Sequence, residues 1–168
     1  VFAYLEVASD RDYYLASVAD TIVMVSSSSG GMVMLGLGFA KTYLAKTFEK
    51  VGLKFNVLHT GEFKGAWENL ARDRMSDSLR VSLQTLLDDM FETYTSETAA
   101  DRKSITTDEL QRELLHGEHY LINATEAQEK HFVDLALDWQ ELGDRLKQAG
   151  DDDLSTISVS KYARAIPL

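Results

Sequence analysis

The sequence contains no cysteine, a single proline and only ten glycines among its 168 residues. Without cysteine the chain forms no disulfide and no thiolate metal site. So little proline and glycine argues against a sandwich of many short strands, which needs frequent tight turns. No apolar run approaches the roughly 18 residues of a membrane-spanning helix, so no segment is predicted to cross a bilayer.

Positive charge is also scarce, since 17 Lys and Arg face 27 Asp and Glu and leave a formal net charge of −10. This charge argues against a nucleic-acid partner, because phosphate binding needs a basic patch. A hydrophobic fraction of 45% and a charged fraction of 26% are typical of a soluble globular chain with a core. The closest histidines, His116 and His119, stand in no recognised metal motif, and we expect neither metal nor cofactor.

Hydrophobic periodicity predicts alternating strands and helices. The expected strands are residues 1–7, 21–25, 53–58 and 155–159, and the expected helices are 13–19, 41–51, 76–98, 104–115, 124–131 and 139–149. This order predicts an α/β fold of strand–helix units with parallel strands and one long helical segment. We expect a single domain over residues 1–168. Because the chain opens in mid-strand at Val1, we expect a piece of a longer protein that lacks its N-terminal strands.

Three local patterns refine these helices. The long helix carries a periodic apolar stripe. Its members are Leu79, Leu83, Leu86, Leu87, Met90 and Tyr94. In the first helix Asp12 is the expected N-cap, with Tyr14, Leu15 and Val18 on one face. Gly52 is the expected stop of the second helix.

Two segments carry family motifs. Residues 13–22 match the pattern Y-Y-x-x-S-x-A-D-x-I, and residues 61–68 followed by Arg72 and Met75-Ser76 match G-x-[YF]-K-[SG]-A-x-E…R…M-S. With weaker matches along nearly the whole chain, these segments resemble the signal peptide peptidase A (protease IV) family. The stretch 162–166 resembles the link between the halves of tandem-domain members. The chain is therefore similar to their N-terminal, lysine-bearing half.

The resemblance implies a crotonase-like (Clp-protease-like) α/β fold and a serine endopeptidase that degrades signal peptides or other apolar peptides. It makes Lys64 the general base of a Ser/Lys dyad, since a serine hydroxyl needs such a base to become a nucleophile. It also implies a homo-oligomer, and a membrane-associated protein on the periplasmic side of the envelope if the source is bacterial.

The family serine lies three residues before the Tyr-Tyr pair, and here that position is Asp10. Ser9 is one residue away, and such a shift would re-aim its hydroxyl, so it is a weak alternative. We therefore expect the serine to come from another domain or a neighbouring subunit. The resemblance puts the oxyanion-hole turn outside this chain or in that serine-bearing domain, with Gly30-Gly31 as a weak substitute.

Two rival interpretations remain. Loss of the serine favours a catalytically inactive homologue that acts as a scaffold or assembly domain. A crotonase-type acyl-CoA enzyme would use the same fold, but a net charge of −10 suits a polyanionic cofactor poorly.

Overall fold

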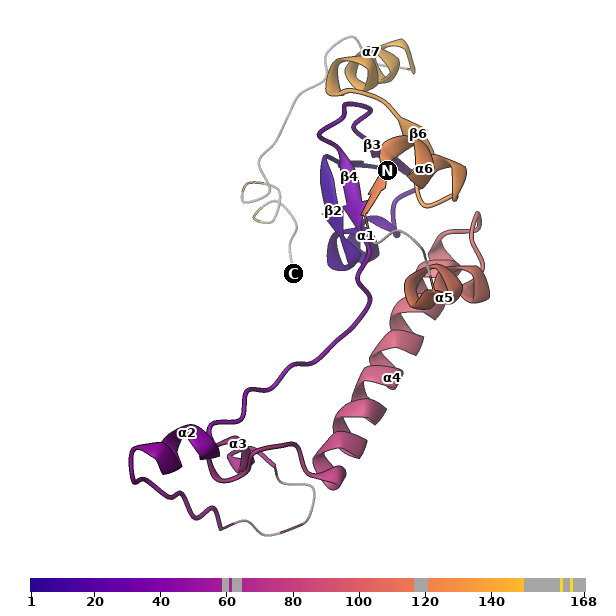
Figure 1. The fold of residues 1–168 in the computed structure, drawn as a ribbon. Coiled ribbons are helices and arrows are strands. Elements are labelled where there is room, and N and C mark those ends of the chain that lie inside the picture. Colours follow the sequence, from indigo (N-terminus) through magenta and orange to yellow (C-terminus); the bar gives the residue numbers. More distant parts are fainter. Residues whose placement is uncertain (59–60, 62–64, 117–120, 150–160, 162–163, 165–168) are drawn as a thin grey trace. The chain divides into compact units, whose positions relative to one another are not determined.

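The computed structural model describes residues 1–58, 61, 65–116, 121–149, 161 and 164 (Figure 1). These residues group into two compact units. The first unit contains residues 1–8, 19–33 and the described residues from 121 onward. The second contains residues 9–18 and the described residues between 34 and 116.

The first unit is built on two small sheets. In one, β3 (Thr21–Met24) lies between β1 (Phe2–Leu5) and β6 (Leu135–Ala136), and both pairings are parallel. In the other, the order is β2 (Val7–Ser9), β4 (Gly31–Val33) and β5 (Leu121–Asn123), with β4 and β5 antiparallel. The parallel pairing of β1 with β3 confirms the arrangement predicted from the strand–helix–strand order.

Two helices complete the first unit. Helix α6 (Ala124–Glu129) begins with a capping box in which Asn123 and Glu126 bond each other's backbone N–H groups. Helix α7 (Trp139–Ala149) has the predicted bounds, and Trp139 packs its ring edge-on against Tyr4. The buried apolar side chains of this unit come mostly from the strands and from the start of α6. They are Ala8, Ala19, Ile22, Val23, Met24, Met32, Ile122, Ala124, Ala127, Phe132, Val133 and Leu142.

The second unit is helical. Its elements are α1 (Asp10–Ala16), α2 (Ala45–Lys50), α3 (Glu68–Ala71), α4 (Asp77–Asp101) and α5 (Thr107–His116). Helix α4 packs on α5 through its C-terminal half, where Tyr94, Thr95 and Thr98 are buried and Gln111 donates to the Thr95 hydroxyl at 3.0 Å. The chain is thus a mixed α/β structure with a parallel sheet and a long helix, as predicted.

The first helix differs from its prediction. It begins at Asp10, three residues earlier than expected, and Ser9 rather than Asp12 is the N-cap. Asp12 instead sits in the first turn and accepts hydrogen bonds from Ser9. The buried positions are Tyr13 and Ala16, whereas Leu15 and Val18 are exposed. Tyr14, Leu15 and Val18 do line one pocket together, as the predicted shared face implies, but Tyr13 and Ala16 make the buried face of the helix.

The strand predicted at residues 53–58 is absent, and that segment has no regular structure. A strand is stable only when a neighbouring strand satisfies its N–H and C=O groups, and no strand pairs with this segment in the described part of the chain. Its main packing is local, because Phe55 lies against Phe48 with ring centroids 4.7 Å apart. Gly52 has a φ of 76° just beyond α2, which confirms it as the helix stop. The strand predicted at 155–159 lies outside the described residues.

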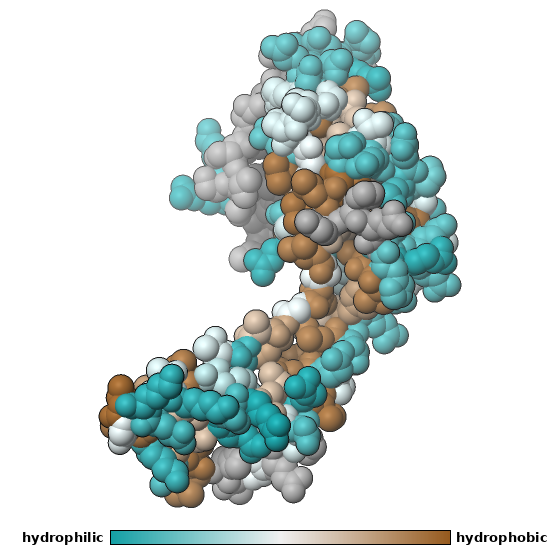
Figure 2. All heavy atoms as spheres, viewed as in Figure 1, coloured by the Kyte–Doolittle hydropathy of each residue, from teal (hydrophilic) through white to brown (hydrophobic). Residues whose placement is uncertain are grey.

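The apolar stripe of α4 is largely uncovered. Leu86 and Met90 are about half exposed, and only Tyr94 of the predicted stripe is buried. Figure 2 shows hydrophobic side chains along this helix. Within the described ranges, no helix is both long enough and apolar enough to cross a membrane.

Candidate functional site

Lys64, the predicted general base, lies outside the described residues, and the described chain resumes at Gly65. Gly65 is buried, and its carbonyl oxygen accepts a hydrogen bond from the Lys41 ammonium at 2.7 Å. A Cβ added at Gly65 would lie 2.8 Å from a methyl carbon of Leu79 on α4. The small residue after the lysine therefore allows the loop to pass close to the start of the long helix.

Glu68 organises the end of this loop. Its carboxylate is buried and accepts from the Tyr43 hydroxyl at 2.6 Å, the Ser76 hydroxyl at 2.6 Å and the Ser76 N–H at 3.2 Å. Ser76 is also the N-cap of α4, where its Oγ accepts from the Leu79 N–H at 3.3 Å. One carboxylate thus joins the loop after Lys64, the segment before α2 and the first turn of α4 into a cluster of Tyr43, Glu68 and Ser76, called the Glu68 cluster below.

The ionisation of the Glu68 cluster follows from these bonds. Burial by itself raises the pKa of Glu68, but the hydrogen bonds from Ser76 and Tyr43 outweigh it and the pKa is lowered. Burial, together with the bond to Glu68, raises the pKa of Tyr43 to about 12. At neutral pH the cluster therefore holds a carboxylate bonded to neutral hydroxyl groups.

Two apolar residues shortly after Lys64 are exposed to water. Ala66 is exposed and Trp67 is 65% exposed, so neither is enclosed within the described part of the chain. Lys41 is half-buried, and its ammonium donates to the Gly65 carbonyl.

At the family's serine position, Asp10 is the first residue of α1, and its Oδ2 accepts from the Leu35 N–H at 2.9 Å. The neighbouring Ser9 is the N-cap. Its hydroxyl donates to Asp12 Oδ2 at 2.6 Å and its N–H donates to the same oxygen at 2.9 Å. These bonds lower the pKa of Asp12. The Ser9 hydroxyl is therefore engaged as a hydrogen-bond donor to a neighbouring carboxylate.

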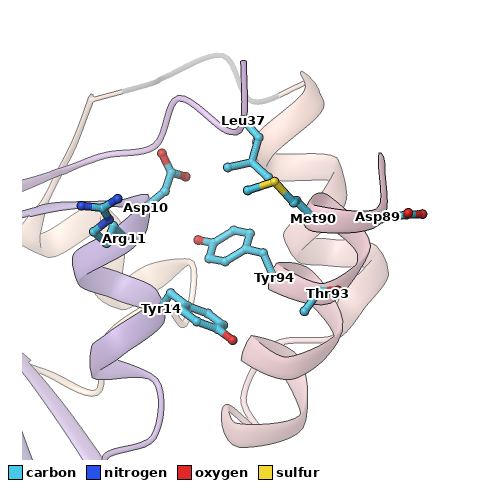
Figure 3. Close-up of a pocket in the computed structure, with 8 residues that line it drawn as sticks. All are labelled: Asp10, Arg11, Tyr14, Leu37, Asp89, Met90, Thr93 and Tyr94. Atoms are coloured by element: carbon cyan, nitrogen blue, oxygen red, sulfur yellow. The ribbon is translucent and has the colours of Figure 1, made fainter. Parts of the chain in front are cut away.

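Asp10 also borders a cavity of about 430 Å³, which the sequence reasoning missed (Figure 3). Its wall is mainly apolar, with Leu37, Met90 and the rings of Tyr14 and Tyr94. Tyr94 closes the predicted apolar stripe on α4 and is its only member with a polar atom. That single phenol in an aliphatic stripe is the signal that could have pointed to the cavity.

The Gly30-Gly31 turn was the weak candidate for an oxyanion hole. The Gly30 N–H donates to the Ser27 carbonyl at 3.0 Å, and the Gly31 N–H donates to the Glu6 carbonyl at 3.1 Å. Because both groups are already bonded to backbone oxygens, this turn does not present them to a substrate. Of the two closely spaced histidines, His116 ends α5 and His119 lies outside the described residues.

Comparison with known proteins decides the family. The model of "Peptidase family S49" matches residues 1–152. The chain belongs to peptidase family S49. Membership implies the Clp-protease/crotonase-like fold, in agreement with the mixed α/β structure and its parallel sheet.

Two curated relatives match smaller regions of this S49 chain. It is 29% identical over 102 residues to "Protease 4" of Haemophilus influenzae, and 26% identical over 94 residues to "Serine protease SPPA, chloroplastic" of Arabidopsis thaliana. The aligned regions cover 61% and 56% of this chain but only 16% and 14% of the relatives. The chain therefore spans a small part of each of these proteins.

Proposed function

We propose that this chain is the lysine-bearing domain of a Ser/Lys endopeptidase that degrades signal peptides or other apolar peptides, with Lys64 as the general base. In this reaction Lys64 accepts the proton of a serine hydroxyl as its oxygen attacks the peptide carbonyl carbon. The same proton then passes to the amine that leaves when the peptide bond breaks.

The Glu68 cluster is the observation that carries this proposal. The glutamate, methionine and serine after the lysine belong to the family motif, and Glu68 and Ser76 bond each other across eight residues. A catalytic group needs a fixed position, because displacements of about 1 Å are costly to catalysis. The cluster supports a positioning role for Glu68 and Ser76, which hold the loop directly after Lys64 against the start of α4.

Lys41 supports the same positioning role. Its ammonium donates to the carbonyl of Gly65, the residue next to Lys64 in the chain, at 2.7 Å. This bond adds a second tie to the segment that follows Lys64, beside the ties made by Glu68.

The proposal takes the serine from outside this chain, because Asp10 cannot serve as the same acyl-transfer nucleophile and the hydroxyl of Ser9, the weak alternative, donates to Asp12. A second domain of a longer polypeptide or a neighbouring subunit would supply it. We therefore propose self-association, which the exposed apolar side chains of α4 support. We also propose that the whole protein acts at a membrane, where apolar peptide remnants collect. A monomer in light scattering of the full-length protein would contradict the self-association.

The second candidate is an inactive homologue that serves as a scaffold. The observation that favours it is Asp10, whose carboxylate replaces the serine and bonds the Leu35 N–H. This candidate predicts assembly without cleavage of any peptide.

The decisive experiment measures cleavage of an apolar peptide by the full-length protein carrying Lys64→Ala. We expect activity to fall by at least about 100-fold, the low end for loss of a general base. Lys54→Ala is the matched control, since Lys54 is an exposed lysine of the same connecting segment, and it should leave activity unchanged. Equal activity of Lys64→Ala and wild type would exclude Lys64 as the base. No cleavage by any variant would favour the scaffold.

A further inference from the structure

The cavity beside Asp10 contains two buried polar atoms without a hydrogen-bond partner in the described part of the chain. They are Asp10 Oδ1 and the Tyr94 hydroxyl. Tyr94 is only 8% exposed, and Figure 3 shows its hydroxyl pointing toward the side of the cavity that Asp10 occupies. Buried polar groups of native proteins are nearly always bonded, so these two oxygens are acceptors that a molecule in the cavity can satisfy.

The chemistry of these two atoms limits the ligand. A carboxylate oxygen only accepts hydrogen bonds, and a phenol oxygen can accept one as well. The rest of the wall is apolar, with Leu37, Met90 and the ring of Tyr14. A fitting ligand therefore has a compact donor group at the end of an apolar chain.

The charge around the cavity favours a cationic donor over a neutral one. Residues 81–101 of α4 contain five carboxylates and neither lysine nor arginine. These are Asp88, Asp89, Glu92, Glu97 and Asp101. The one basic residue that borders the cavity, Arg11, is exposed to water. The negative potential of these carboxylates attracts a cation. This attraction adds to the hydrogen bond that the Asp10 carboxylate can accept from the ligand.

We propose that this cavity binds a primary ammonium group carried on an apolar chain, with Asp10 Oδ1 and the Tyr94 hydroxyl as acceptors and Tyr14, Leu37 and Met90 against the chain. The source is either the free amino terminus of an apolar peptide or a lysine side chain beside apolar residues. The assignment of this ligand to a substrate rests on the proposed function. A signal peptide carries a positively charged segment followed by an apolar one, and so has both parts of the ligand. The cavity would then hold the basic end of the substrate.

The test is calorimetric titration of the 168-residue chain with hexylammonium, and with 1-hexanol as the uncharged probe of equal length. We expect saturable binding of hexylammonium and at least about tenfold weaker binding of hexanol, the factor for one charge-assisted hydrogen bond. Equal affinity for the two probes, or no binding of hexylammonium, would overturn the proposal. Because no peptide is cleaved in this assay, its result is independent of Lys64 and of the proposed peptidase activity.

Two variants locate the site. Asp10→Asn keeps an oxygen for the Leu35 N–H and removes the charge, and Tyr94→Phe removes a hydroxyl that has no bond to lose, so we expect Tyr94→Phe to fold. Each should weaken hexylammonium binding by about tenfold. Asp77→Asn is the control, because Asp77 is an exposed carboxylate in the first turn of α4 and lies outside residues 81–101, so affinity should stay within about twofold. If Asp10→Asn does not fold, Tyr94→Phe alone decides. Unchanged affinity in Tyr94→Phe contradicts the proposal.

The two sources of the ammonium are distinguished with short apolar peptides. A leucine-rich peptide with a free amino terminus is compared with its acetylated form, and with an acetylated peptide that contains one lysine. Binding of the first alone indicates recognition of an amino terminus, and binding of the third indicates recognition of lysine. Tight binding of the acetylated peptide without lysine would refute an ammonium site.

Discussion

Ser76→Ala is the sharpest perturbation that the Glu68 cluster offers. The substitution removes the N-cap of α4, which costs about 0.5–2 kcal/mol, and a hydrogen bond to a buried carboxylate, which costs about 1.5–3 kcal/mol. The two contributions share one side chain, and Ser76 is half-buried. We therefore expect the free energy of unfolding to fall by about 2–4 kcal/mol, measured by urea unfolding at pH 7 with circular dichroism.

The control is Ser96→Ala, the same substitution at an exposed position of the same helix, which should change stability by less than about 0.5 kcal/mol.

The pH dependence of the free energy of unfolding gives a second check. The pKa of Glu68 is lowered in the folded chain, so its contribution is complete above the unfolded value of about 4.3 and is lost as the pH falls through the folded value. The difference between the two variants should shrink below that pH. Equal destabilisation by Ser76→Ala and Ser96→Ala would refute the role given to the cluster.

Two further predictions follow from packing and ionisation. Tyr43→Phe should lower stability by about 1.5–3 kcal/mol and remove the phenol that titrates near 12 in an alkaline absorbance titration. Since the folded pKa is raised, this stabilisation is present below the unfolded value of about 10 and is lost as the pH rises through about 12. An unchanged titration curve would count against it. Gly30→Ala should cost about 1–3 kcal/mol, because its Cβ would lie 2.5 Å from the Val25 carbonyl oxygen. Gly38→Ala is the control, because a Cβ at that position has no atom within 4 Å. Equal stability of the two glycine variants in urea unfolding would show that the contact between residue 30 and the Val25 carbonyl can relax.

The sequence predicted the elements whose signals are local. The period of the long helix, the stop at Gly52 and the bounds of α7 all depend on neighbouring residues along the chain. The parallel pairing of β1 and β3 followed from the order of elements, since consecutive parallel strands need a crossover between them.

One error arose where a distant partner decides the structure, and another where two neighbouring residues suit the same role. Residues 53–58 alternate like a strand, but alternation does not supply the neighbouring strand that such a segment needs. Asp12 is a good capping residue, yet Ser9 takes that role and Asp12 bonds back to it. Both residues suit a cap, and their chemistry does not say which one precedes the helix.

The candidate site was only partly visible for the same reason. The motif around Lys64 pointed to a lysine base, and that role remains a prediction. The sequence did not show that Glu68 and Ser76 bond each other, because nothing in a linear motif says which of its members touch. The phenol of Tyr94 was a hint of the cavity, but no local pattern shows that Asp10 borders it too, since 84 positions of chain separate the two residues.

The 25 residues of α4 are buried only near one end, at Tyr94, Thr95 and Thr98, and are tied at the other by Ser76. A helix with so little cover is marginal in water over its middle turns. Backbone amides of residues 81–93 should therefore exchange with deuterium faster than those of residues 94–98 in the chain alone. Covering Leu86 and Met90 would slow that exchange. The exchange rate along α4 thus measures whether another domain or subunit has docked, without any need for catalysis.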